Sequence, residues 1–135
     1  MRVAGVNLAA VLVAAVAFYL IGFLIYGFIF DQAYLLSISG HTAEQMAAVG
    51  TTRMAYGVVM PLATAGFMAV LFNWASVSGM MSGVKWGAVI ACASAIPATW
   101  YAWVYGIGGC TEPLIDSGHL LIGHMVAGGI LASWK

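Results

Sequence analysis

Four long apolar stretches separated by short polar segments divide the chain. The first, residues 8–30, has no charged residue and exceeds the ~20 residues that a helix needs to cross a bilayer. The predicted spans of the single domain, residues 1–135, are residues 7–30, 54–74, 86–105 and 114–134. The pattern therefore predicts an all-α, integral membrane four-helix bundle.

The start of the first stretch also has features of a cleaved signal peptide. Arg2 precedes the apolar run, and Ala15, Val16 and Ala17 resemble a cleavage site. The run continues to Phe30, however, whereas the apolar core of a signal peptide is short. We therefore expect a retained helix.

The fourth stretch is short for a span. Its strictly apolar part, residues 120–134, would cover roughly 22 Å of a ~30 Å hydrocarbon layer. The helix is therefore expected to begin near Leu114, which brings Asp116 and His119 to the membrane boundary.

Small residues recur every four positions in the third and fourth spans. They are Gly87, Ala91 and Ala95, then the pairs Gly123/Ala127 and Gly128/Ala132. This spacing places them on one helix face, where another helix backbone approaches closely. We expect such faces to support a homo-oligomer or docking to a larger membrane complex.

The polar segment between the first two spans has a helix-start signature. Thr42 followed three residues later by Gln45 is typical of a capping box, in which each side chain bonds the other's backbone N–H. We predict a short amphipathic helix that ends at about Val49, before Gly50.

Composition indicates that lipid is the main solvent. The chain is 64% hydrophobic and 6% charged, against about 25% charged in soluble domains. Formal net charge is zero, so no basic face for nucleic acid is expected. Cys92 and Cys110 are too far apart in the predicted topology for a disulfide and are expected as free thiols.

The basic residues predict an orientation. Arg2, Lys85 and Lys135 fall on the side of the two termini, and Arg53 is the single base on the other side, where all four acids lie. Cytoplasmic loops carry the excess of lysine and arginine. We therefore expect a multi-pass membrane protein with both termini in the cytoplasm.

Short motifs mark the ends of these spans. They are Val6-Asn7, Ile25-Tyr26 with Phe30, Lys85-Trp86-Gly87, Leu114-Ile115-Asp116 with Gly118-His119, and Trp134. With them the chain resembles, over nearly its whole length, a bacterial family of small four-helix membrane proteins called domain of unknown function 1761. The resemblance implies this architecture and a location in the bacterial inner membrane, and no known activity.

His124 is the candidate functional residue inside the fourth span. It lies roughly 7–8 Å deeper along the helix than His119, and an ionisable residue inside a membrane is a functional hypothesis by default. Its structural alternative is a neutral histidine that bonds Tyr19, Thr64 or Ser94, which lie at similar depth. The functional alternatives are a proton relay or a cofactor contact.

Asp116 and His119 are three residues apart and so share a helix face. We expect an ion pair, or a carboxylate favoured by the helix N-terminus. A divalent metal site would need further ligands, such as His41, Glu44 or Asp31. His119 and His124 point about 140° apart, which disfavours a shared metal. We predict no metal and no cofactor.

The function expected from these patterns is a non-enzymatic, structural or accessory role in the membrane. Its partners are the lipid bilayer and either further copies or a larger complex. The chain has no hydrolase signature and no glycine-rich phosphate loop. The alternative is a small oligomeric transporter or channel that uses His124, His119, Asp116 and Glu112.

Overall fold

The computed structural model describes residues 2–3 and 5–134, except the side chains of residues 50–54, and confirms the all-α class. The elements in chain order are β1 (Arg2–Val3), β2 (Val6–Asn7), α1 (Leu8–Leu24) with a π-helical turn (Ile25–Ile29), α2 (Gln32–Ser39), α3 (Ala43–Ala55), a 3-10 turn (Tyr56–Val58), α4 (Val59–Trp74), α5 (Met80–Ile90) with a π-helical turn (Ala91–Ala95), α6 (Ile96–Tyr105) and α7 (Thr111–Ser133).

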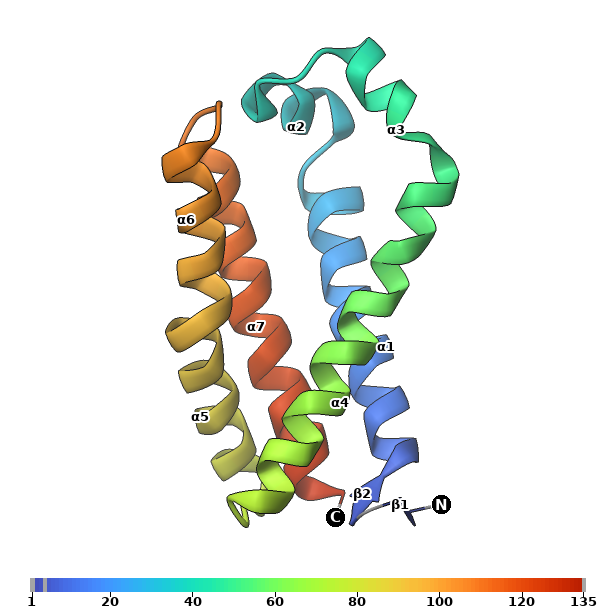
Figure 1. Ribbon diagram of the computed structural model, residues 1–135, viewed down its shortest axis with the longest axis vertical. Helices are drawn as coiled ribbons and strands as arrows, with labels where there is room; N and C mark the ends of the chain where they lie inside the picture. The colour runs from blue at the N-terminus through green and yellow to red at the C-terminus, as the bar shows by residue number, and fades with distance from the viewer. Residues whose placement is uncertain (1, 4, 135) are drawn as a thin grey trace.

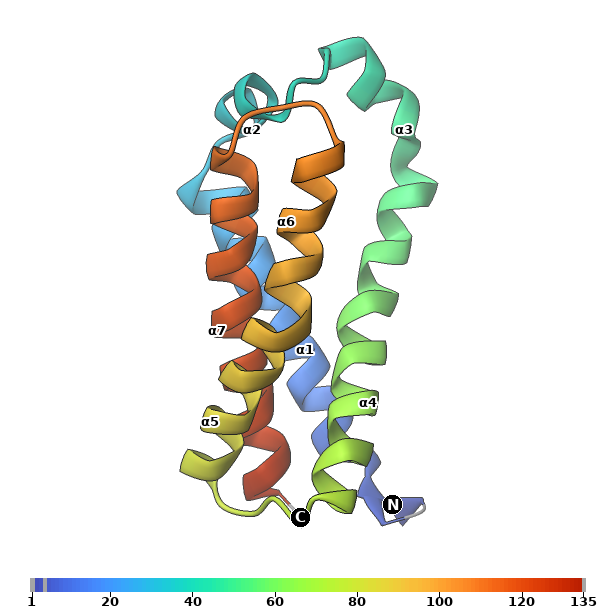
Figure 2. The ribbon, with the colours of Figure 1, turned by 60° about the vertical axis from the view of Figure 1, so that its left-hand side comes forward.

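Four helical segments of the described chain are long and apolar enough to cross a membrane: Leu8–Ile29, Tyr56–Trp74, Met80–Tyr105 and Thr111–Ser133. They run along the long axis of the molecule (Figure 1). Both termini lie at one end, and α2 and α3 lie at the other (Figures 1 and 2). The third and fourth segments begin before the predicted Trp86 and Leu114.

Two of the prolines inside the long segments, Pro61 and Pro97, coincide with changes of helical hydrogen bonding. Pro97 lies at the start of α6, directly after the π-helical turn Ala91–Ala95, and Pro61 follows the 3-10 turn Tyr56–Val58. Proline has no N–H, and its ring collides with the carbonyl four residues earlier. The irregular turns let both helices continue past the prolines.

The segment between the first two long helices contains two helices where one was predicted. The capping box is confirmed: Thr42 N–H donates to Gln45 Oε1 (2.8 Å), and Gln45 N–H donates to Thr42 Oγ1 (3.2 Å). The predicted end at Gly50 is wrong, because α3 continues to Ala55. The other helix of this segment, α2, ends at Gly40. This glycine has a left-handed conformation (φ 74°), which glycine adopts without strain.

Helix α7 is the element around which the other long helices pack. It contacts α5 and α1 most extensively, and also α4 and α6. The buried core consists mainly of alanine with a few large side chains, among them Phe18, Met68, Phe72 and Leu131. Alanine-rich interfaces let helix backbones approach closely, so the position of α7 is set by backbone-to-backbone contact.

The closest approach is between α5 and α7, as the small residues predicted. A Cβ at Gly87 would lie 2.1 Å from the carbonyl oxygen of His124, and one at Gly83 would lie 2.1 Å from that of Gly128. Gly79 N–H also donates to Ala132 O (3.0 Å). The small-residue faces are therefore used inside this chain, and α5 begins early because Gly83 belongs to the contact.

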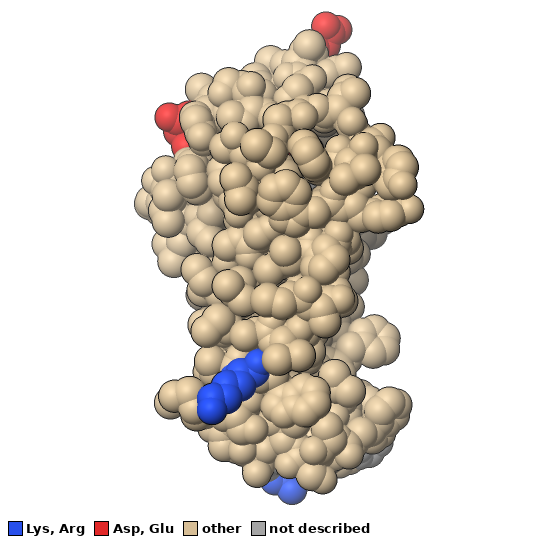
Figure 3. Space-filling view, turned by 90° about the vertical axis from the view of Figure 1, so that its left-hand side faces the viewer, with Lys and Arg blue, Asp and Glu red and all other residues tan. Residues whose placement is uncertain are grey.

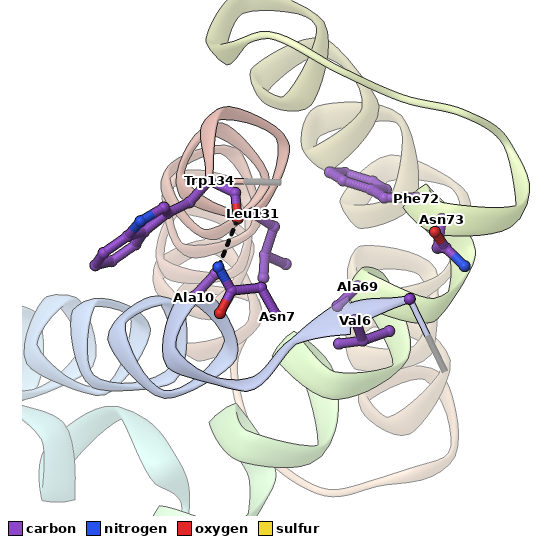
Figure 4. Close-up of a pocket in the computed structure, with 9 residues that line it drawn as sticks. Val6, Asn7, Ala10, Ala69, Phe72, Asn73, Leu131 and Trp134 are labelled. Atoms are coloured by element: carbon purple, nitrogen blue, oxygen red, sulfur yellow. Dashed lines mark hydrogen bonds between the residues drawn. The ribbon is translucent and has the colours of Figure 1, made fainter. Parts of the chain in front are cut away.

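The two ends of the chain are joined by one side chain. Asn7 Oδ1 accepts a hydrogen bond from Ala9 N–H (3.2 Å) and so caps α1, while Asn7 Nδ2 donates to Trp134 O (3.0 Å) at the end of α7 (Figure 4). The adjoining pocket of about 20 Å³, which Phe72 also lines, has room for roughly one water molecule. Asn7 thus provides a hydrogen-bond partner for a backbone N–H at the start of α1 and for a backbone carbonyl at the end of α7.

Charge is separated along the long axis. On the face in Figure 3, the lysine and arginine atoms lie toward the end that holds the termini. The aspartate and glutamate atoms lie at the opposite end, and the surface between carries neither. Elsewhere along the long segments large apolar side chains are exposed, such as Phe67 on α4 (78% exposed).

Candidate functional site

Asp116 and His119 both lie in α7, which starts at Thr111, and both face α1. The Tyr26 hydroxyl donates a hydrogen bond to Asp116 Oδ1. Tyr26 belongs to the π-helical turn that ends the first long segment. The carboxylate is therefore used in a contact between helices, and the expected ion pair with His119 is replaced by this tyrosine.

Aromatic contacts continue from Tyr26 toward the middle of the molecule. The ring of His119 meets Tyr26 edge-on (centroids 5.4 Å apart) and Phe18 edge-on (5.4 Å). Phe18 in turn meets His124 edge-on (5.1 Å). The residues form one row, Asp116–Tyr26–His119–Phe18–His124, which we call the α1–α7 row.

Two glycines make room for this row, one on each helix. A Cβ at Gly22 in α1 would lie 2.9 Å from Nε2 of His119, and a Cβ at Gly123 in α7 would lie 2.7 Å from the ring of Phe18. Phe18 and Gly22 are four residues apart, as are His119 and Gly123, so each pair shares a helix face. Each helix inserts a ring into the glycine notch of the other.

His124 is buried (5% exposed) and bonds its own helix. Its Nδ1 lies 2.7 Å from Leu120 O, and because a carbonyl only accepts, Nδ1 carries the hydrogen. The predicted bond to Tyr19, Thr64 or Ser94 is wrong. Ser94 donates to Ile90 O instead (2.9 Å). His124 therefore holds α1 and α7 together through its ring contact with Phe18.

His119 differs from His124 in its hydrogen bonding. The backbone of Phe18 faces its imidazole, but Nε2 is buried and makes no hydrogen bond of ordinary geometry within the described part of the chain. Phe18 also separates the two histidines, and a phenyl ring neither accepts nor donates a proton. The α1–α7 row is thus continuous as packing and interrupted as a proton path.

The remaining predicted polar residues are not members of the row, although Glu112 is close enough to Asp116, Tyr26 and His41 to interact with them electrostatically. Glu112 is exposed in the first turn of α7. Asp31 caps α2 by accepting from Tyr34 N–H (2.7 Å). Among the described residues, no three histidine, cysteine, aspartate or glutamate side chains gather as a metal site would require. Cys92 and Cys110 are free, as expected, and both are exposed.

A recess of about 450 Å³ lies beside the row, between α1 and α4. The two helices diverge toward the end that holds α2 and α3 (Figures 1 and 2). His119 and Tyr26 form part of its wall, together with Tyr19 and Thr64. The sequence did not predict this recess, or the roles of Phe18 and Gly22. The residue pattern of a single helix does not show which other helix packs against each of its faces.

Fold and site together define a mostly helical protein with four candidate membrane-crossing helices joined by buried polar and aromatic contacts. The chain belongs to the family described as protein of unknown function (DUF1761), whose profile matches residues 9–132. This confirms the resemblance found in the sequence motifs. No curated protein and no solved structure matches the chain.

Proposed function

We propose that the chain is a multi-pass protein of the bacterial inner membrane, in which the four long segments form a four-helix bundle with both termini in the cytoplasm. The uncharged surface between two charged ends supports the membrane location (Figure 3), as do the many large apolar side chains exposed on the long segments. Arg2 and Lys85 support the orientation, because cytoplasmic segments carry the excess of basic residues.

The two native cysteines offer a direct test of this topology. Cys110 precedes α7 at the end opposite the termini, and Cys92 lies within the third long segment. A membrane-impermeant maleimide added to intact cells should label Cys110 and leave Cys92 unlabelled. Ser78→Cys in a Cys110→Ser background should react only after the inner membrane is permeabilised. The reverse pattern contradicts the orientation, and labelling of all three positions contradicts the membrane location.

Within the membrane, we infer a non-enzymatic, structural or accessory role. The observation that carries this inference is the hydrogen bond from Tyr26 to Asp116. The more deeply placed of the two acids in α7 joins the first long segment to the fourth instead of facing an open site. The same holds for Asn7 and Trp134 at the other end. Polar groups that stabilise helix pairs are what a bundle needs for its own assembly.

A partner would meet the outside of the bundle rather than the small-residue faces, which are already filled. The third long segment is the most exposed, with 11% of its apolar window buried against 33% in the first and fourth. Its outer part, α6, has no buried residue among those described. The proposed contact surface for a larger complex or a second copy is therefore the α6 surface, which includes Tyr101 and Trp103.

Photo-crosslinking in native membranes tests this role. A benzophenone amino acid at Tyr101 should form a protein–protein adduct with a second copy or with another membrane protein. The same amino acid at Phe67, which is exposed on α4, is the control. Adducts at Tyr101 that match those at Phe67, together with a monomeric and partnerless protein in native nanodiscs, would contradict the accessory role.

A small oligomeric transporter or channel is the second candidate. The observation in its favour is that Glu112, Asp116, His119 and His124 follow one another along α7 from its exposed start to its buried middle. Phe18 opposes it, because it separates the two histidines. Proton or ion flux into proteoliposomes tests this second function. Flux that is lost in Asp116→Ala and His124→Ala supports transport, and flux that neither variant changes rules out transport through these residues.

A further inference from the structure

The recess between α1 and α4 has the size and lining of a small-molecule site. Its volume of about 450 Å³ is within the roughly 300–1,000 Å³ typical of ligand pockets. Its described lining is mostly apolar and contains no aspartate, glutamate, lysine or arginine. A charged ligand would have no counter-charge there, so an uncharged and largely apolar molecule fits best.

Two hydroxyl groups in this wall have no hydrogen-bond partner among the described residues. Tyr19 and Thr64 lie near the middle of the segments Leu8–Ile29 and Tyr56–Trp74. An unpaired hydroxyl in an apolar layer is costly, because no water replaces the missing bond. From mid-span, neither side chain reaches the membrane boundary.

Four other hydroxyls in the long segments avoid this cost by bonding the carbonyl four residues earlier. Ser94, Thr99, Ser117 and Ser133 all do so, at 2.9, 3.1, 2.6 and 2.7 Å. Thr64 does not, although its position in α4 offers the same option. Its hydroxyl thus remains available to a molecule in the recess.

The helical hydrogen-bond pattern is also interrupted beside the recess. Gly57 and Pro61 both line it, and Pro61 has no N–H with which to donate the i+4 bond to the Gly57 carbonyl. A ligand hydroxyl has both a donor and two acceptor lone pairs, so it suits the hydroxyl groups of this wall.

The recess is too small for a helix of a second copy. A helix about 10 Å wide that rises 1.5 Å per residue displaces roughly 120 Å³ per residue. The recess would therefore hold only about one helical turn. A hydrocarbon chain or a ring system fits the same volume.

We propose that this recess binds an uncharged, lipid-soluble molecule that carries a hydroxyl group. Tyr19 and Thr64 hold the hydroxyl, and the hydrocarbon part lies along Phe23, Met60 and Leu120. The proposal rests on the membrane location proposed above, since the ligand would enter from the lipid layer.

A pair of photoreactive probes tests the proposal. The full chain is reconstituted in phosphatidylcholine vesicles with a long-chain alcohol that carries a diazirine, or with the matched diazirine alkane that lacks the hydroxyl. Labelled residues are mapped by mass spectrometry. The alcohol should label Phe23 and Met60 about fivefold more than the alkane, the factor that one hydrogen bond of about 1 kcal/mol gives.

Matched variants separate binding in the recess from general lipid contact. Gly57→Phe should fill the recess and lower alcohol labelling at Phe23 and Met60 at least about fivefold. Gly66→Phe is the control: neither glycine has an atom within 4 Å of its Cβ position, and Gly66 does not line the recess. Thr64→Val and Tyr19→Phe remove the hydroxyls and keep the shape, so alcohol labelling should fall toward the alkane level.

Two results would overturn the proposal. Equal labelling by alcohol and alkane would mean that lipid chains fill the recess without selection. Labelling unaffected by Gly57→Phe would place the probe elsewhere. Failure of the membrane location is distinguishable, because then neither probe labels the exposed Phe67 on α4.

Discussion

The imidazole of His119 occupies the space that a side chain at position 22 would need. A Cβ at Gly22 would lie 2.9 Å from Nε2 of His119, and the reciprocal contact places the Phe18 ring 2.7 Å from a Cβ at Gly123. The antiparallel helices α1 and α7 thus exchange rings and notches over one helical turn. This exchange positions every residue of the α1–α7 row.

The first prediction concerns these notches. Gly22→Ala and Gly123→Ala should each lower the free energy of unfolding by about 1–3 kcal/mol, because the added methyl group overpacks a filled contact. Denaturation by sodium dodecyl sulfate in mixed micelles measures this. Gly118→Ala in α7 is the control, since no atom lies within 4 Å of its Cβ position. His119→Ala removes the ring, so in that background Gly22→Ala should lower the free energy of unfolding by less. An equal loss in both backgrounds would contradict the contact between position 22 and the His119 ring.

The second prediction concerns the α5–α7 contact. Gly87→Ala should cost about 3 kcal/mol or more, because its methyl group would meet the backbone carbonyl of His124 at 2.1 Å and a backbone has no rotamer to yield. The same denaturation assay applies. Gly66→Ala on α4 should leave stability unchanged or raise it by up to about 1 kcal/mol through helix propensity. A Gly87→Ala variant as stable as Gly66→Ala would refute the close approach.

The third prediction concerns the hydrogen bond between Tyr26 and Asp116. A double-mutant cycle with Tyr26→Phe and Asp116→Ala should give a coupling of about 0.6–2 kcal/mol, the range for hydrogen bonds between membrane helices. Tyr101→Phe paired with Asp116→Ala should show no coupling, because Tyr101 contacts Tyr105 and lies on the exposed side of α6. Strict additivity for the first pair would mean that the bond does not form.

The fourth prediction separates packing from chemistry at His124. His124→Phe keeps a ring against Phe18 and removes a buried polar group, so it should change stability by less than about 1.5 kcal/mol. His124→Ala should cost about 3 kcal/mol, because it leaves a cavity beside Phe18. Calorimetry of the purified variants gives both values. A His124→Phe variant that folds normally and loses flux would reassign His124 to transport.

The apolar pattern was sufficient to predict the four long segments, because span length follows from membrane thickness. It failed where tertiary contact overrides composition. Residues 80–85 precede the predicted third span, 86–105, yet they are helical, and Gly83 among them packs on Gly128. The site shows a different limit. Counting residues from the helix ends gives the depth of a side chain in the membrane. At the depth of His124, this count selects Tyr19 in α1. Adjacent residues point about 100° apart, so rotation of α1 decides that Phe18 faces α7.

Motifs far apart in the chain gained meaning only in three dimensions. Tyr26 and Asp116 belong to two of the motifs that carry the family resemblance, and the structure joins them. Asn7 and Trp134 belong to two others and are joined as well. A sequence shows that such positions exist, but their pairing requires the helices to be placed side by side.

The bond between Tyr26 and Asp116 joins residues 90 positions apart, so it links the first long helix to the last. At a synthesis rate of about 5–20 residues per second, roughly 5–20 seconds separate the emergence of its two partners from the ribosome. Throughout that interval the first helix has neither the notch for Phe18 nor the acceptor for Tyr26. During synthesis α1 therefore remains without its packing partner until α7 has left the ribosome. A chain that stalls before α7 lacks the helix around which the others pack.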